Sequence, residues 1–598
     1  MKITHTGSTI DMKHYAPMAL GNGELSLLVD YKGSSRTRSF CGDQIRTGIW
    51  MAGVRYDKPN FPLVPFGYFF DSFDDEEPLE WQQTFDVTGA RLETECAYRD
   101  GSVVATSILC PFGHRFVLIE KKILNRGTSP VAETFHFAPP RTVLRTVDRN
   151  RTDFRIDTFE PVSGTIAFFA LEGQASFRRD AEDITGVMES GRVVFVLATD
   201  QASAEYAGGR TFAELWAEHE ADWENFWRES KVPADISERE MQVARTSEYH
   251  LRISAAPWGG MPIGIYPTHW EGKYFGFDSY FSVMGLIASG HLDLAKNAAS
   301  FFASHLEGAK KRAYFYCSKS SEAAKYPWQS IEIPQLEGAR PGFWLEHIFH
   351  MTHIGLICHE CAKALRDGTF DREVAYPVLK ACAEYHRIFS VCHLGDGRDI
   401  IGKCTDLERL GPGRENAFMT TCGVIALFRA AADLAEKLQC DEAERRLWRE
   451  LAASLTCTLP NDGARYVPYP GCAEPSVALL TGLYPYRVLP PDDPKQLRAF
   501  EWFCENERTV GNMYPTGDSL CIWYAGIKTM ALLRLGRIED AGRLIAKMAG
   551  ATGNFSEVFE IYETCHHPWF TTAEGIYLES LLAYCEAKKR RAQTGKGT

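Results

Sequence analysis

The stretch TFAELWAEHEADWENFWRES, residues 211–230, separates two parts of the chain that have different sequence patterns. Three tryptophans spaced i, i+7 and i+11 share one helical face with a leucine and a phenylalanine: Leu215, Trp216, Trp223, Phe226 and Trp227. This apolar face predicts a helix packed along a domain boundary. The chain has 598 residues, more than one hydrophobic core usually serves, so at least two domains are expected.

Residues 1–208 are predicted to form an antiparallel β-sandwich. The run RLETECAYRDGSVVATSIL alternates polar and apolar residues on both sides of Asp100-Gly101, which indicates a hairpin. Further strand-like runs follow: RFVLIEKKIL, VAETFHF, GTIAFFALEG and RVVFVLATD. Many short strands separated by turn residues are typical of a sandwich.

The rest of the chain reads as mostly helical. Residues 209–236 are predicted to be a helical linker, residues 237–592 a barrel-shaped catalytic domain, and residues 593–598 a flexible tail. About twelve helices are counted after residue 237, one of them over residues 474–482, enough for six hairpins that close into an (α/α)6 barrel. Its inner helices would surround a funnel, and loops at one end would build the site. The predicted fold class is therefore multidomain β + α. No sequence repeat is visible, so the barrel is inferred from count and spacing.

The composition argues against several classes of function. The formal net charge is −13, and no notable Lys/Arg tract precedes the KKRR near the C-terminus, so nucleic acid is not expected as a partner. The N-terminus lacks the apolar run of a signal peptide, and no run is long enough to predict a membrane span. The 17 cysteines are scattered, many within apolar runs, as expected for reduced cysteines in a cytoplasmic protein.

Two aromatic loops suggest sugar binding. In THWEGKYFGFDSYF, residues 268–281, aromatic side chains crowd around Glu271 and Asp278. A sugar site combines aromatic platforms with carboxylates that accept hydrogen bonds from hydroxyl groups. The alternative is that Asp278 caps the next helix. In AKYPWQSIE, residues 324–332, Trp328 has a glutamine and a glutamate nearby, and a hydrophobic plug is the alternative.

A charged loop, KCTDLERLGPGREN, precedes a long helical stretch and holds a candidate acid, Glu408. A general acid needs a raised pKa and a fixed position in a partly dry cleft. Asp406 nearby would raise the pKa of Glu408, whereas Arg409 or Arg414 would lower it. The alternative is a solvated loop whose Glu415 begins the next helix.

A second acidic loop precedes the last helix. In NFSEVFEIYETCHHPWF, Glu557, Glu560 and Glu563 recur every three residues between aromatic residues, with a solvated edge loop as the alternative. Together the two acidic loops fit a two-carboxylate glycosidase, in which one group protonates the leaving oxygen and the other activates water. Inversion needs the two carboxyl groups roughly 6.5–9.5 Å apart, a gap that opposite sides of a barrel mouth would span. No metal or organic cofactor is implied.

Three further motifs could indicate metal or phosphate binding, but the sequence supports each of them less well. His347, His350 and His353 are spaced three apart, which suits a metal, but they drift around the helix and fit funnel-lining residues better. Cys358 and Cys361 lack a second pair for a zinc site. The run GRDIIGK matches the start of a phosphate-binding loop, but Cys404 stands where Ser or Thr is required.

These motifs make the sequence similar to the six-hairpin glycosidases, most closely to the family of maltose, trehalose and kojibiose phosphorylases and related hydrolases. That family has a β-sandwich, a helical linker and an (α/α)6 barrel, in this order. Its Phe-Trp-Asp loop resembles the segment at Phe277-Asp278, and its Tyr/Phe-Pro-Trp-x-Ser motif matches residues 326–330. A Glu-His pair near the start of the next helix corresponds to Glu346-His347.

The resemblance also implies catalytic roles. The family's acid motif, Gly-Pro-Asp-Glu-Tyr-His, corresponds in place to CTDLERLGPGREN, which implies Glu408 as the acid, with Asp406 as its competitor. In related hydrolases the base precedes the final helix, which implies Glu560 by its spacing to Gly575-Ile576, with Glu557 close behind. The phosphate-handling Lys-Gln segment of the phosphorylases is not evident, which favours water as the acceptor.

The sequence therefore predicts an inverting glycoside hydrolase acting on an oligosaccharide or small glycoside. The residues expected to bind the sugar are Trp270, Glu271, Asp278, Tyr326, Trp328, Gln329 and Arg414. Three alternatives stay open: an inverting disaccharide phosphorylase, a sugar lyase or epimerase that uses His347, His350 and His353, and a non-catalytic carbohydrate-binding protein. The edge of the sandwich is compatible with a homodimer, although nothing in the sequence requires one.

Overall fold

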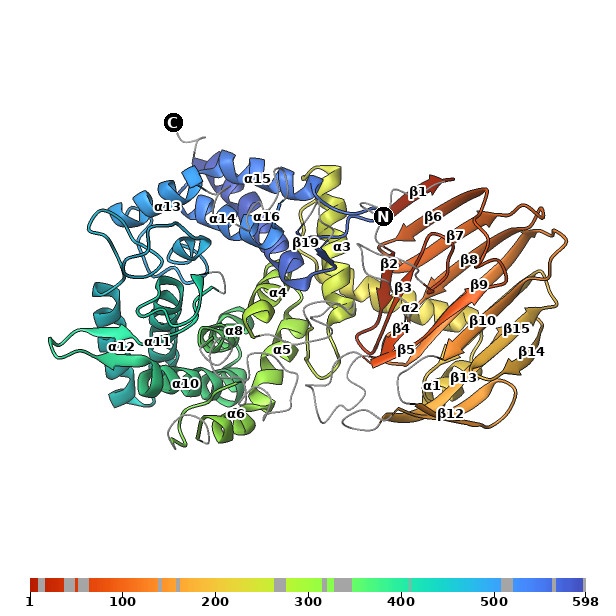
Figure 1. Ribbon diagram of the computed structural model, residues 1–598, viewed down its shortest axis with the longest axis horizontal. Helices are drawn as coiled ribbons and strands as arrows, with labels where there is room; N and C mark the ends of the chain where they lie inside the picture. Colours follow the sequence, from red (N-terminus) through yellow and green to blue (C-terminus); the bar gives the residue numbers. More distant parts are fainter. Residues whose placement is uncertain are drawn as a thin grey trace.

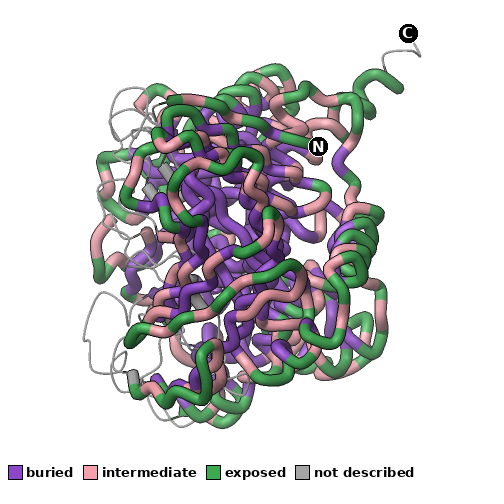
Figure 2. Tube along the Cα trace, turned by 90° about the vertical axis from the view of Figure 1, so that its right-hand side faces the viewer, coloured by how far each residue is buried: buried purple, intermediate pink, exposed green. Residues whose placement is uncertain are grey.

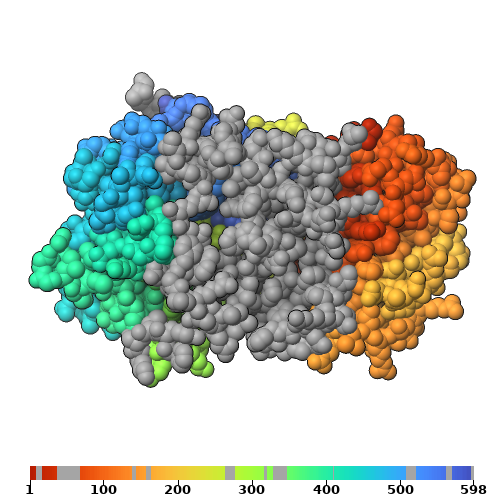
Figure 3. Space-filling model, viewed as in Figure 1, coloured from red at the N-terminus to blue at the C-terminus, as the bar shows by residue number. Residues whose placement is uncertain are grey.

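The computed structural model describes residues 1–8, 17–36, 49–51, 64–137, 142–156, 162–262, 276–314, 320–326, 347–407, 410–506, 520–561 and 566–594. A β-sandwich and a helical barrel lie side by side along the long axis, with the sandwich at the right of Figure 1 and the barrel at the left. The same division is visible on the surface in Figure 3. Buried segments lie at the centre of the molecule and exposed ones at its rim (Figure 2).

The sandwich consists of two antiparallel sheets. Within the described ranges, one sheet has nine strands in the order β1 (Lys2–Gly7), β6 (Glu80–Asp86), β7 (Arg91–Ala97), β8 (Val103–Leu109), β9 (Phe116–Asn125), β16 (Arg192–Ala198), β13 (Val162–Glu172), β12 (Arg151–Ile156) and β11 (Thr142–Thr146). The other has seven, in the order β14 (Ala175–Asp180), β15 (Asp183–Met188), β10 (Ala132–Phe137), β5 (Val64–Asp71), β4 (Ile49–Met51), β3 (Leu25–Val29) and β2 (Met18–Gly21). The predicted sandwich is thus confirmed.

The predicted hairpin is formed by β7 and β8. Ala97 pairs with Val103, and Gly101 adopts a φ of +87° in the turn, a conformation that L side chains rarely adopt. Buried and exposed residues alternate along β6 and most of β7, which places one face of the sheet against the core. The alternation of polar and apolar residues in the sequence therefore predicted correctly which face of these strands is buried.

The sandwich encloses a charged triad. Lys121 of β9 lies 2.7 Å from Asp71 of β5 and 2.8 Å from Glu133 of β10, and all three side chains are buried. Burial raises the pKa of Glu133 to about 7, although Lys121 acts in the opposite direction. A buried lysine needs such partners, because an unpaired charge is strongly disfavoured away from water.

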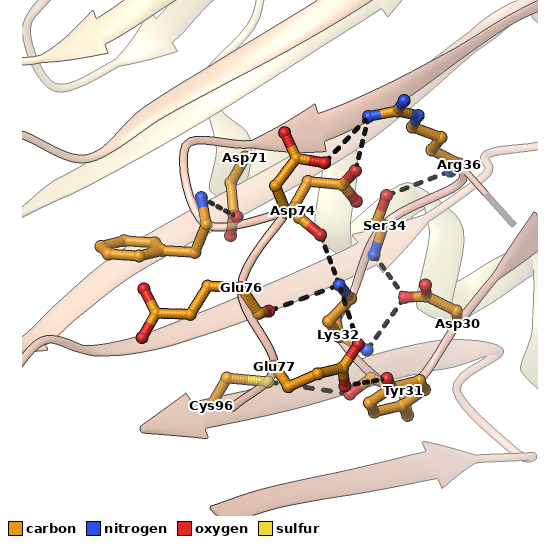
Figure 4. Close-up of polar contacts among 12 residues, drawn as sticks. Asp30, Tyr31, Lys32, Ser34, Arg36, Asp71, Asp74, Glu76, Glu77 and Cys96 are labelled. Atoms are coloured by element: carbon orange, nitrogen blue, oxygen red, sulfur yellow. Dashed lines mark hydrogen bonds and ion pairs between the residues drawn. The ribbon is translucent and has the colours of Figure 1, made fainter. Parts of the chain in front are cut away.

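A second buried polar group lies at the turn that follows β3 (Figure 4). Asp30 accepts hydrogen bonds from the backbone of Lys32 (2.9 Å) and Ser34 (3.1 Å), and burial raises its pKa to about 7. Arg36 donates a 2.9 Å hydrogen bond to the Asp74 carboxylate, and Lys32 donates to the Asp74 carbonyl oxygen. The two bonds to Asp74 join the turn after β3 to the segment after β5.

The sequence that divides the chain folds as α2 (Phe212–Glu229), a helix between the two parts (Figure 1). Thr211 and Glu214 form a capping box at its start. Trp223 is fully buried, and its ring contacts Phe112 of the sandwich and Tyr249 of the first barrel helix. A short helix that the sequence did not predict, α1 (Gln201–Gly208), precedes α2.

The helical part is a closed ring. In the described part of the chain, each of six inner elements packs against the next, and the last packs against the first: α4 (Gly276–Ser289), α8 (His350–Leu365), α11 (Phe418–Leu438), the 3₁₀ helix η5 (Val477–Leu480), α14 (Ile522–Arg534) and α16 (Thr571–Thr594). Six outer helices alternate with them along the chain: α3 (Glu238–Ser254), α5 (Leu292–Ser304), α10 (Tyr376–Tyr385), α12 (Glu442–Cys457), α13 (Pro494–Asn506) and α15 (Ile538–Gly550). This is the predicted (α/α)6 arrangement.

The remaining elements are short. They are α6 (Leu306–Ala313), α9 (Gly368–Phe370), the π-helical turns η2 (Asp371–Ala375) and η3 (His386–Ser390), and the two-stranded sheets β17 (Val391–His393) with β18 (Asp399–Ile401) and β19 (Phe559–Ile561) with β20 (His566–Pro568). The helix predicted over residues 474–482 was wrong in extent, since only the single turn η5 forms there. Of the described helices, only α11 is long and apolar enough to cross a membrane, and 89% of its apolar window is buried inside the structure, as expected for an inner helix.

Candidate active site at one end of the barrel

All four loops singled out in the sequence precede an inner helix of the ring. The starts of several inner helices lie together: Phe277 at the start of α4 packs against Phe349, directly before α8, and against Trp523 at the start of α14. Thr572 at the start of α16 bonds Asp278 of α4. The described starts of α4, α8 and α16, which follow three of the four loops, are therefore neighbours. Several predicted residues in these loops lie outside the described residues: Trp270, Glu271, Trp328, Gln329, Glu346, Glu408, Arg409 and Glu563.

Residues on either side of position 408 form hydrogen bonds with each other and with α11. Cys404 and Arg414 exchange two backbone hydrogen bonds of 3.0 and 2.8 Å, which close the loop between them. Asp406 Oδ1 accepts bonds from the backbone and hydroxyl of Thr420, at 2.8 and 2.6 Å, and Oδ2 accepts one from the Met419 backbone. Burial raises the pKa of Asp406 to about 6, while these bonds oppose the rise.

Asp406 therefore acts as a cap for the first turn of α11. Its bonds to α11 are those of a helix cap, and the choice between Asp406 and Glu408 as the acid of this loop stays a prediction. The predicted sugar-binding residue Arg414 is half-buried, donates from Nε to the Leu410 carbonyl oxygen at 2.5 Å and lies over the Tyr469 ring at 4.5 Å. In this structure Arg414 braces the loop.

The turn before α16 holds Glu557. Thr552 and Val558 form an isolated bridge across its base, and Gly553 donates a backbone hydrogen bond to the Glu557 carbonyl oxygen at 2.9 Å. Ser556 adopts a φ of 65°, in the left-handed region that a non-glycine residue occupies only at a cost. Strain of this kind is common at functional sites.

The Glu557 carboxyl group is fully buried. Oε2 accepts a 2.8 Å hydrogen bond from the Phe555 backbone, whereas Oε1 has no hydrogen-bond partner among the described residues. Burial raises the pKa of Glu557 to about 7, and His250 and Arg239 oppose the rise. Glu557 is thus a buried carboxyl group with a raised pKa and with one oxygen, Oε1, that has no hydrogen-bond partner among the described residues.

Helix α3 fixes this turn. Arg239 donates to the Ala549 carbonyl oxygen at 3.0 Å, to Ser556 Oγ at 3.0 Å and to Thr552 Oγ1. Thr246 donates to the Phe555 carbonyl oxygen at 3.1 Å. The sequence did not single out Arg239, because its helix read as an ordinary outer helix; its guanidinium group can serve several acceptors at once.

The sandwich also touches the turn. His5 of β1 bonds the Asn554 carbonyl oxygen, and its ring packs edge-on against Phe555 at 5.0 Å. Phe555, Phe559 and Trp569 belong to the sandwich's hydrophobic core. The other candidate base, Glu560, lies in β19, but its side chain is outside the described residues.

Two other predicted sugar ligands lie in different surroundings. Asp278, in the first turn of α4, is half-exposed and accepts a 3.0 Å hydrogen bond from Thr572 of α16. Asp278 lies within α4, so it is not the N-cap residue that the alternative interpretation predicted. Tyr326 is buried, and its hydroxyl donates to the Phe302 carbonyl oxygen at 2.7 Å. Sugar binding by either residue stays a prediction.

The three histidines near the start of α8 are fully enclosed. Burial lowers the pKa of His347 and His353 to about 3 and that of His350 to about 4. His350 Nε2 bonds the Tyr326 carbonyl oxygen at 2.9 Å, and His353 packs against Phe277 and Tyr280. Their surroundings are those of neutral packing residues, and no group of three His, Cys, Asp or Glu in the described part of the chain is placed to hold a metal ion.

Comparisons with known proteins identify the architecture. A protein assigned as a kojibiose phosphorylase from the human microbiome matches 96% of this chain and 88% of its own, with a TM-score of 0.69 and 10% identity. A bacterial glucoamylase solved with acarbose matches 98% of both chains, with a TM-score of 0.62 and 11% identity. The chain has the fold of the six-hairpin glycosidases. No protein-family model matches the sequence, and neither does any curated protein.

Proposed function

We propose that this protein is a carbohydrate-active enzyme that hydrolyses a glycosidic bond with two carboxyl groups and inversion at the anomeric carbon. The fold supports the general class, because a protein assigned as a kojibiose phosphorylase and a bacterial glucoamylase share it. The observation that carries the proposal is the state of Glu557, a buried carboxyl group on a strained, braced turn with one oxygen lacking a partner among the described residues.

In this proposal Glu408 is the acid and Glu557 is the base. Glu408 gives its proton to the glycosidic oxygen as the bond to the anomeric carbon breaks. Glu557 takes a proton from a water molecule, whose oxygen bonds to the opposite face of the same carbon. The substrate gains one water, and the catalytic protons return through solvent. We favour Glu557 over Glu560 because burial and the bond from Phe555 fix its carboxyl group.

Phosphorolysis is the second candidate, favoured by the match to a protein assigned as a phosphorylase. There, phosphate would replace water as the nucleophile and a sugar 1-phosphate would be released. A panel of disaccharides and aryl glycosides, assayed with and without inorganic phosphate, separates the two. Hydrolysis predicts phosphate-independent turnover, and NMR of the first product should show the anomer opposite to that of the substrate.

Three variants test the assignments. Glu408→Gln and Glu557→Gln should each lower kcat by a factor of about 100 or more, the usual scale for losing a general acid or base. Glu560→Gln is the matched control and should keep most of the activity. Full activity in Glu557→Gln with loss in Glu560→Gln would move the base to Glu560. If calorimetry showed tight oligosaccharide binding and no substrate were turned over, the protein would be a carbohydrate-binding protein and not an enzyme.

A further inference from the structure

A buried pair of ionisable side chains lies beside the turn that carries Glu557. His250 Nδ1 of α3 and Glu574 Oε1, in the first turn of α16, are 2.5 Å apart, and both side chains are fully buried. A histidine that bonds a carboxylate in this way has its tautomer and ring orientation fixed, so that Nδ1 carries the shared proton.

The position of His250 on α3 places it on the helix face next to the turn that carries Glu557. Thr246, four residues before His250 on α3, bonds the Phe555 carbonyl oxygen in the turn, and residues four apart share a helix face. His250 therefore lies on the side of α3 that faces the turn. The charges that act on Glu557 from the packed elements are His250 and Arg239, both on α3, while Glu574 of α16 bonds His250.

Three buried atoms in these side chains lack a hydrogen-bond partner among the described residues. They are Nε2 of His250, Oε1 of Glu557 and Oε2 of Glu574. Buried polar atoms are nearly always satisfied, so unsatisfied ones in a group of titratable residues call for an explanation. A site whose residues exchange protons with water or substrate supplies one.

We propose that His250, oriented by Glu574, is a positioning residue that favours the carboxylate form of Glu557, the form that accepts a proton from water. This inference rests on the proposed function, in which Glu557 is the base. His250 acts to lower the pKa of Glu557, because positive charge next to a carboxyl group favours its ionised form, and the bond to Glu574 holds the ring in place. Both charges are shielded from solvent, so their interaction is weakly screened by salt.

A purely structural role is tested with a second buried histidine–carboxylate pair, formed by His291, the residue before α5, and Glu248 of α3. His291 Nε2 bonds Glu248 Oε1 at 3.0 Å, and both side chains are buried. His291→Gln should therefore perturb packing much as His250→Gln does. Only His250→Gln should change the ionisation of Glu557.

The experiment measures the pKa of Glu557 without substrate, by carbon NMR of protein labelled at the glutamate carboxyl carbons. The Glu557 signal is the one absent from Glu557→Gln. His250→Gln should raise the Glu557 pKa by about half a unit or more, and His291→Gln should leave it unchanged. No shift in His250→Gln, or an equal shift in His291→Gln, overturns the inference.

A second variant serves if His250→Gln does not fold. His250→Asn places an amide nitrogen where Nδ1 lies, so the bond to Glu574 can be kept while the titratable ring is removed. The Glu557 pKa should rise in His250→Asn as in His250→Gln, and an unchanged Glu557 pKa in this variant overturns the inference.

The activity profile separates this inference from the proposed function. If Glu557 is the base, the acidic limb of kcat/KM should move to higher pH in His250→Gln by the same amount as the NMR pKa. An NMR shift without a matching shift in activity would support the pair's influence on Glu557 and would remove Glu557 from the role of base.

Discussion

Thr572, in the first turn of α16, donates a 3.0 Å hydrogen bond to Asp278, in the first turn of α4. These are the last and first inner helices, so the bond lies where the ring closes. The two helices approach closely below it: a Cβ on Gly575 would lie 2.3 Å from the Phe281 carbonyl oxygen, and one on Gly285 would lie 2.5 Å from the Gly575 Cα. Closure therefore depends on two glycines that admit the opposing backbone.

Gly575→Ala should destabilise the protein by about 3 kcal/mol or more, because the atom that obstructs the new methyl group is backbone. The matched control is Gly308→Ala in α6, where a Cβ meets nothing within 4 Å. That change should be neutral or stabilise by about 0.5–1 kcal/mol, since alanine favours helix. Urea denaturation of both variants tests this, and equal stabilities would contradict the tight closure.

Asp406 and Glu408 should separate by phenotype. Asp406→Asn weakens the cap of α11 and should lower the free energy of unfolding by about 0.5–2 kcal/mol. Glu408→Gln should abolish turnover and leave the melting temperature nearly unchanged. Calorimetry and activity measured on the same preparations check both. The reverse pattern, an inactive but fully stable Asp406→Asn, would make Asp406 the acid.

The stability of the protein should fall as pH rises through Glu557's titration. The folded pKa of Glu557, about 7, is above the ordinary value of 4.5, so folding favours the protonated form. Its contribution is complete below about pH 4.5 and is lost by about pH 7, a change of roughly 3 kcal/mol by linkage. Denaturation at a series of pH values should show a smaller decline in Glu557→Gln than in the parent protein. An unaltered slope would refute the buried titration.

The charged triad of the sandwich should be sensitive to loss of its cation. Lys121→Met leaves Asp71 and Glu133 buried without their partner, and should cost about 3–5 kcal/mol. Lys122→Met is the control from the same strand, because Lys122 is 42% exposed and its partner Glu120 keeps a 2.7 Å hydrogen bond from Arg192. It should change stability by less than about 1 kcal/mol. Similar losses in both variants would show that the triad is dispensable.

Periodicity in the sequence predicted the parts of the fold that packing makes regular. Strand alternation located the hairpin at Asp100-Gly101, and the tryptophan stripe located α2, because each element buries one face. It overestimated the helix at residues 474–482, whose apolar residues are buried although only one turn is helical there. A helical spacing of apolar residues predicts a helix reliably only where a long element has one buried and one exposed face.

The candidate site was predicted less completely, because its residues are joined by contacts distant in sequence. Glu557 stood out as an acid between aromatic residues, but its partners Arg239 and His250 lie more than 300 positions earlier on a helix with no unusual pattern. The capping role of Asp406 was equally hidden, since it depends on the positions of Met419 and Thr420. Spacing along a chain does not report such convergence.

The aromatic residues on either side of Glu557 have a consequence for how the molecule is assembled. Phe555, Phe559 and Trp569 are inserted into the core of the other domain, and His5 meets Phe555 there. A barrel produced without residues 1–230 would present these rings to solvent and lose the support of its candidate base. The two halves should therefore melt in one transition, and neither should tolerate being exchanged for a foreign counterpart.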